Sequence, residues 1–164
     1  MSKNILRLYR EIRIISRKFD NMQNMDEVLD WITRFCWSKK IGIQYIPYMD
    51  PHDPSICYEW PRLIIFNENW HKIAEKPFML SHEIGHILNG DTSHYHNHNC
   101  LHGVGEEEYL ANVFAIKLLI QYCQENDIHF NNIYDFAKAF GIPSNVYYIL
   151  EKYVDVNKCN IVDF

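Results

Sequence analysis

Two histidines flank a glutamate in the stretch "SHEIGHILNG", which covers residues 81–90. On a helix each residue advances about 100° around the axis, so His82 and His86 lie on one face, one turn apart. Both imidazoles can then bind one metal ion, while Glu83 beside them can act as a general base on a metal-bound water. This spacing therefore indicates metal-assisted hydrolysis.

The same short pattern also arises without a function. In a chain of this composition an H-E-x-x-H match is expected by chance at roughly 3 in 100. Three polar residues on an ordinary amphipathic helix are therefore an alternative interpretation. A third metal ligand at a workable distance along the chain would distinguish the two.

Glu108, 22 residues after His86, is the candidate for this third ligand. On a helix it shares a face with Asn112, one turn later, and with the small residues Ala111 and Ala115. Small side chains beside a carboxylate let two helices approach closely around a metal. Asn112 can accept the second ring N–H of a ligating histidine, a contact that fixes the tautomer and the orientation of the imidazole.

Two helices must carry these residues. Pro77 suits the first turn of the motif helix, and Gly90 can supply a left-handed cap at its end. The second helix is expected from about Glu106 to Glu125. An acidic first turn interacts favourably with the positive end of a helix. This effect accounts for the two glutamates before Glu108 and is the alternative explanation for Glu108 itself.

The remaining pattern predicts an α+β fold, in which a small twisted sheet packs against the motif helix and the Glu-bearing helix. The stretch "IQYIPY" is expected to be a short strand, and Pro47 favours an edge position. Two strands, or one strand bent at Pro61, are expected in "ICYEWPRLIIFNENW". Helical spacing of apolar residues predicts four further helices, at about 4–19, 26–38, 132–140 and 144–153.

Composition narrows the class of protein. The 164 residues are 48% hydrophobic, enough for one globular domain with a real core. The apolar runs are too short to span a membrane, and no secretory signal is visible at the N-terminus. Five cysteines without a C-x-x-C pair are typical of reduced thiols. We therefore expect a cytoplasmic protein with no membrane partner; the sequence does not define its oligomeric state.

A resemblance to a known family rests on two paired motifs. "HEIGH", followed by Glu108, Ala111, Asn112 and Phe114 in "EYLANVFAIKLL", resembles the ImmA/IrrE family of gluzincin-type zinc metallopeptidases, which occur in bacteria, phages and conjugative elements. The resemblance covers about residues 25–153. It implies a Zn²⁺ cofactor, a minimal zincin-like core with extra N- and C-terminal helices, and hydrolysis of peptide bonds.

By this resemblance His82, His86 and Glu108 would be the zinc ligands, and Glu83 the catalytic base. We expect a single metallopeptidase domain over residues 1–164. Its N-terminal helices would occupy about 1–40, the zinc-site core 41–125, and a C-terminal helical pair 126–164.

A histidine-rich loop follows the motif helix and is open to several interpretations. Its histidines and one cysteine alternate along the chain, at His94, His96, His98, Cys100 and His102. An extended loop would present all five on one side, so a second metal site is one interpretation, and simple solvation is the other. A third is that Tyr95 or His98 donates a hydrogen bond to the developing oxyanion, which a gluzincin requires.

The substrate is expected to be a protein. Proteases of the resembled family typically relieve gene repression by cutting a DNA-binding repressor, so an antirepressor of a phage or mobile element is implied. The strand "RLIIFN" is expected to pair with an extended substrate. The N-terminal helix or the C-terminal pair would share in recognition.

The sequence also leaves room for two other classes of function. The C-terminal pair has Gly141 in its turn, as a helix-turn-helix often does, but Lys152 is the only cation of its second helix. Together with the net charge of −5, this predicts no direct binding of nucleic acid. The alternative function is a zinc-containing, non-catalytic domain that sequesters a transcription factor.

Overall fold

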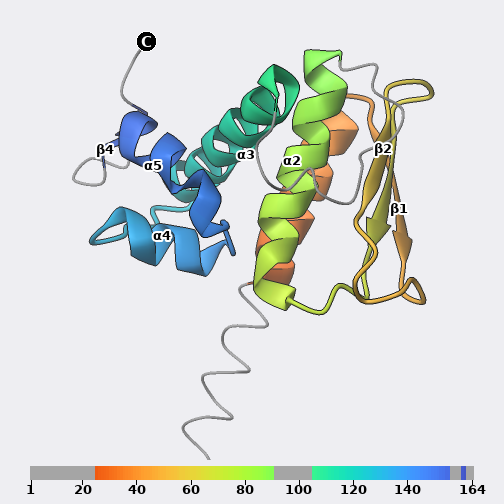
Figure 1. Cartoon of the computed structure of the whole chain (residues 1–164), viewed down its shortest axis with the longest axis horizontal. Coiled ribbons are helices and arrows are strands. Elements are labelled where there is room, and N and C mark those ends of the chain that lie inside the picture. Colours follow the sequence, from red (N-terminus) through yellow and green to blue (C-terminus); the bar gives the residue numbers. More distant parts are fainter. Residues whose placement is uncertain (1–24, 91–104, 156–159, 162–164) are drawn as a thin grey trace, which may run out of the picture.

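The computed structural model describes residues 25–90, 105–155 and 160–161 (Figure 1). The architecture is α+β, as predicted, with a three-stranded mixed sheet beside a group of helices. Both the helix expected at 4–19 and the histidine-rich loop lie outside the described residues. Among the residues that the structure describes, no helix combines the length and the apolar character needed to cross a lipid bilayer.

Between residues 25 and 153 the helices and strands follow one another in the order expected. A helix covering residues 25–38 comes first. The strands and helices after it are β1 (Gly42–Ile46), β2 (Ile56–Tyr58), β3 (Leu63–Asn67), η1 (Ile73–Glu75), α2 (Lys76–Asn89), α3 (Glu106–Glu125), α4 (Ile133–Ala139), η3 (Ser144–Val146) and α5 (Tyr147–Tyr153). A two-stranded ribbon, β4 (Val154–Asp155) and β5 (Asn160–Ile161), completes the described chain.

The sheet has the strand order β1-β3-β2. β1 is an edge strand, as Pro47 predicted, and it pairs in parallel with β3. β2 pairs antiparallel with the other side of β3, from Ile56 opposite Ile65 to Tyr58 opposite Leu63. The expectation that "RLIIFN" adds a substrate strand is therefore wrong, because both edges of β3 are already occupied. Strand order depends on pairings between distant segments, which periodicity within one segment does not reveal.

The core lies between the sheet and the helices that cover one of its faces. Figure 1 shows α2 and helix 25–38 beside the sheet, with α3, α4 and α5 on the far side of α2. Ile64 and Phe66 of β3 are fully buried, and so are Leu80 and Ile84 of α2 and Leu119 of α3. Burial of such apolar surface is the main force that holds these layers together.

The C-terminal pair is docked onto the segment that leads into α2. Gly141, between α4 and η3, has a φ of 63°, which is accessible to glycine without strain. A Cβ at this position would lie 2.2 Å from the carbonyl oxygen of Ala74 in η1. Only glycine can bring these two backbones so close, so the turn after α4 is fixed against the start of α2.

Candidate metal centre

Two helices carry the candidate site, and their local sequence explains their ends. α2 has Pro77 in its first turn and ends at Gly90, whose φ of 74° is left-handed. α3 runs from Glu106 to Glu125, the limits that the sequence predicts. The two helices approach closely where Gly85 faces Ala111: a Cβ on Gly85 would lie 2.9 Å from the Cα of Ala111. This approach brings the motif of α2 next to the first turns of α3.

The close approach gathers two imidazoles and one carboxylate in the interior. The Nε2 atom of His82 lies 3.3 Å from Oε2 of Glu108, and the Nε2 atom of His86 lies 3.4 Å from Oε1 of the same carboxylate. The two Nε2 atoms are 2.9 Å apart. Within the described residues this is the group of His, Cys, Asp or Glu side chains arranged to hold a metal ion, with ligand atoms all within 4.8 Å of one another.

Asn112 contacts the far side of one imidazole. Its Oδ1 atom lies 3.0 Å from Nδ1 of His82, and both side chains are buried. An amide oxygen can only accept, so Nδ1 carries the proton and donates it to Asn112. The lone pair of His82 is then on Nε2, the nitrogen that faces Glu108 and His86. The spacing of Glu108 and Asn112 in the sequence predicts this contact.

Glu83 is buried beside the two histidines, with only 8% of its surface exposed. Its Oε2 atom has no hydrogen-bond partner among the described residues. A buried carboxylate oxygen without a partner is unfavourable by about 1–3 kcal/mol or more. Such a group fits a site whose missing partner is a bound molecule, such as the water that a general base deprotonates.

The donor set fits zinc. Neutral imidazole nitrogens and a carboxylate oxygen are common zinc ligands, and catalytic zinc sites use three protein ligands and leave one position open. The three side chains come from two packed helices, which supply the rigid support that such a site needs. Tyr95 and His98, the candidates for the oxyanion donor, lie outside the described residues.

Two features that shape this region were not singled out from the sequence. Gly85 was not identified from the sequence as the contact between the helices. A glycine in a helix that is expected to pack against alanines does indicate such a close contact. A cavity at the start of α2, lined in part by Trp70 and Phe78, also had no signal. It is formed by segments far apart in the chain, so no local pattern reveals it.

Comparison with known proteins agrees with the geometry. The family described as Peptidase_M78, IrrE N-terminal-like domain, matches residues 36–148, which include both helices of the site. Among curated proteins and solved structures, nothing matches the chain significantly. The family match covers more than half of the chain and includes every residue of the candidate centre. The chain belongs to the family of IrrE N-terminal-like metallopeptidase domains.

Proposed function

We propose that this protein is a zinc-dependent metalloendopeptidase. The observation that carries the proposal is the buried group of His82, His86 and Glu108 with the partnerless carboxylate oxygen of Glu83 on the same helix turn. A purely structural zinc site is normally closed by a fourth protein ligand and gains nothing from a buried base. The combination favours a hydrolytic site.

Each residue would have a distinct task. His82, His86 and Glu108 would hold the zinc ion, which supplies Lewis acidity that lowers the pKa of a water molecule toward about 7. Glu83 would accept the proton of that water as the scissile carbonyl is attacked, and then deliver it to the leaving amine. Asn112 would keep the proton of His82 on Nδ1, so that Nε2 stays available to the metal.

The edge strand β2 is the place where an extended substrate can pair. β2 packs against α2, and its outer edge has no strand beside it among the described residues. A peptide added there would form main-chain hydrogen bonds and run past the motif helix. This assignment replaces the central strand β3, whose two edges are occupied.

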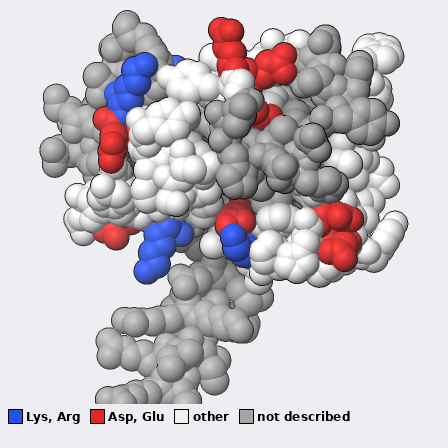
Figure 2. Space-filling view, viewed as in Figure 1, with Lys and Arg blue, Asp and Glu red and all other residues white. Residues whose placement is uncertain are grey.

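The family and the charge of the chain support a proposal for the class of substrate. Family members of this type typically cut repressors, so we propose a DNA-binding repressor or related regulator as the natural substrate. The chain has a net charge of −5, which steers a basic partner toward it, although salt limits the range of this attraction. On the face drawn in Figure 2, the Lys and Arg side chains of the described residues do not gather into a patch, and Asp and Glu lie among them. This distribution favours a protein partner over nucleic acid.

Hydrolysis is tested with the matched variant Glu83→Gln. The zinc-loaded protein is incubated with an unfolded general substrate, such as reduced casein, and new termini are counted by mass spectrometry. The wild-type protein should cleave, and Glu83→Gln should retain zinc and fold but lose at least 10²-fold in rate, because an amide cannot accept the proton. Equal cleavage by the variant would refute the assignment of the base. Zinc binding without any cleavage would support the sequestering domain instead.

The regulator is tested separately by co-expression with the transcriptional regulator encoded next to this protein. A single cut in the regulator, absent with Glu83→Gln, is the expected result. An intact regulator, under conditions where casein is hydrolysed, would leave the peptidase in place and exclude the antirepressor role for that regulator.

A further inference from the structure

The cavity at the start of α2 has a volume of about 320 Å³. We propose that it is the subsite that receives one apolar side chain of the substrate, a leucine-sized or aromatic group beside the bond to be cut. The inference rests on the proposed peptidase function and adds to it the class of residue that the enzyme selects. The residues that carry the argument are Trp70, Glu75, Phe78, Met79, Pro143 and Asn145.

The cavity continues the metal-binding face of α2 toward its N-terminus. Each residue advances about 100° around the helix axis. Viewed along this axis, Phe78 and Met79 therefore flank the face that carries His82 and His86. The ring centroid of Phe78 is 6.2 Å from that of His82, so one aromatic ring separates the cavity from a metal ligand. A substrate held at the metal would therefore place a neighbouring side chain within reach of this cavity.

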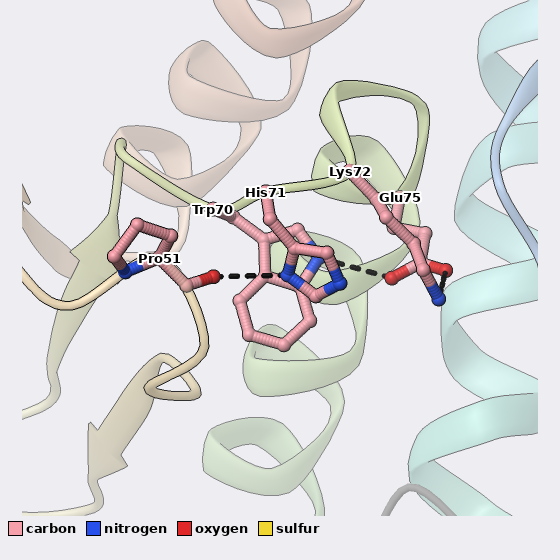
Figure 3. A network of polar contacts seen from close by, with 5 residues as sticks. All are labelled: Pro51, Trp70, His71, Lys72 and Glu75. Carbon is pink, nitrogen blue, oxygen red and sulfur yellow. Dashed lines mark hydrogen bonds and ion pairs between the residues drawn. The ribbon is translucent and has the colours of Figure 1, made fainter.

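The walls suit an uncharged apolar group. Glu75 is the carboxylate among the lining residues, and both of its oxygens are already engaged. The indole N–H of Trp70 donates to Oε2 at 2.9 Å, and the ammonium group of Lys72 contacts Oε1 at 2.8 Å (Figure 3). A cationic substrate side chain would have no free carboxylate to pair with among the described lining residues, because Glu75 is already engaged. An apolar side chain would gain contact with the apolar walls, which are Trp70, Phe78, Met79 and Pro143.

A hydrogen bond and a backbone packing contact fix the positions of the segments that form the cavity. His71 and the carbonyl oxygen of Pro51 are 2.9 Å apart, so the segment that carries Trp70 is tied to the loop before β2 (Figure 3). On the opposite side, Gly141 packs against the backbone of Ala74, which fixes the turn that precedes Pro143 and Asn145. A preformed cavity binds a side chain without the entropy loss of ordering its walls.

The wall formed by Pro143 and Asn145 comes from the C-terminal helical pair, outside the two helices of the metal centre. Asn145 is exposed on η3, next to Ser144, which is also exposed but is not among the lining residues. The pair therefore gives two matched positions for a bulky substitution. Asn145→Trp should fill the cavity, and Ser144→Trp should place the same side chain in solvent.

The test uses hydroxamates, which bind zinc and require no turnover. Acetohydroxamate is compared with peptide-like hydroxamates that differ only in one side chain: methyl, isobutyl or benzyl. Dissociation constants for the zinc-loaded 164-residue chain are measured by calorimetry, and the indole N–H signal of Trp70, assigned with Trp70→Phe, is followed by NMR. The isobutyl and benzyl compounds should bind about 10- to 100-fold more tightly than the methyl compound and should shift the Trp70 signal.

In Asn145→Trp the preference should fall to about threefold or less, whereas Ser144→Trp should keep both the wild-type preference and the wild-type affinity for acetohydroxamate. Equal binding of the methyl and isobutyl compounds by the wild-type chain would overturn the subsite. So would an undiminished preference in Asn145→Trp. Failure of acetohydroxamate to bind the zinc-loaded chain would instead overturn the peptidase proposal, and the subsite with it.

Discussion

The amide of Asn112 determines which nitrogen of His82 can face a metal. Removing this acceptor leaves Nδ1–H of His82 buried without its partner and lets the ring change tautomer or rotate. We expect Asn112→Ala to lower zinc affinity about 10- to 100-fold, measured by competition with a chromophoric chelator. Asn112→Asp keeps an acceptor oxygen and should stay within a few-fold of wild type. Equal affinities in all three proteins would exclude a role for Asn112 in the site.

Much of the residue-scale picture is available from spacing alone. The i, i+4 relation between His82 and His86, and between Glu108 and Asn112, predicts shared faces because both segments are regular helices. Spacing within each helix does not predict that the His82/His86 face of α2 contacts the Glu108/Asn112 face of α3, because His86 and Glu108 are 22 residues apart in the chain. That meeting depends on Gly85, whose importance appears only when a second helix is placed against it.

The close approach of α2 and α3 can be tested at Gly85. An alanine there would put Cβ 2.9 Å from the Cα and 3.0 Å from the carbonyl oxygen of Ala111, and rigid backbone must then move. We expect Gly85→Ala to destabilise the fold by about 1–3 kcal/mol, despite a gain of about 1 kcal/mol in helix propensity, and to weaken zinc binding by displacing Glu108. Urea unfolding and chelator competition measure the two effects.

Ser81, one turn earlier on α2, is the matched control. It is fully buried, and its hydroxyl has no hydrogen-bond partner among the described residues. Ser81→Ala removes this unsatisfied group without adding volume, so stability should be unchanged or higher by about 1 kcal/mol. If Gly85→Ala were as stable as Ser81→Ala, α2 and α3 would not approach each other closely enough at Gly85 and Ala111 to exclude a Cβ atom.

At the scale of elements, helices were more predictable than the sheet. Pro77 and Gly90 mark the ends of α2 through local backbone chemistry, so its limits follow from the sequence. The order β1-β3-β2 places β1 beside β3, and the paired residues of these two strands are 21 positions apart in the chain, as Gly42 and Leu63 are, so that local patterns do not reveal the pairing. Asn67 shows the same limit: its buried amide donates to the carbonyl oxygens of Asp50 and Asp53, which only the folded loop brings together.

Across the whole molecule, stability should fall in alkali because of a buried thiol. Burial raises the pKa of the Cys36 thiol to about 12, above its usual value near 8.5. Between about pH 9 and 12 the unfolded chain releases this proton while the folded chain retains it, so the free energy of unfolding decreases as pH rises. For Cys36 alone the loss reaches about 4 kcal/mol at pH 12.

Urea unfolding at pH 7 to 11 measures this trend. Burial also raises the pKa of Tyr45 and Tyr122, which adds to the decline. Cys36→Ala should be less stable at pH 7, because a methyl group replaces the larger side chain in the core, but its stability should depend less steeply on pH above 9. Parallel pH profiles for the two proteins would contradict the assignment to Cys36.

If His82, His86 and Glu108 form one zinc site, the zinc content of the purified chain reports it most directly. Elemental analysis of the protein prepared without chelator should give about one zinc per chain for wild type and for Glu83→Gln. His82→Ala and Glu108→Ala should retain little or none, with circular dichroism to confirm that they remain folded. A folded wild-type chain that carries no transition metal and takes up none on addition of zinc would show that these three residues do not form a zinc site.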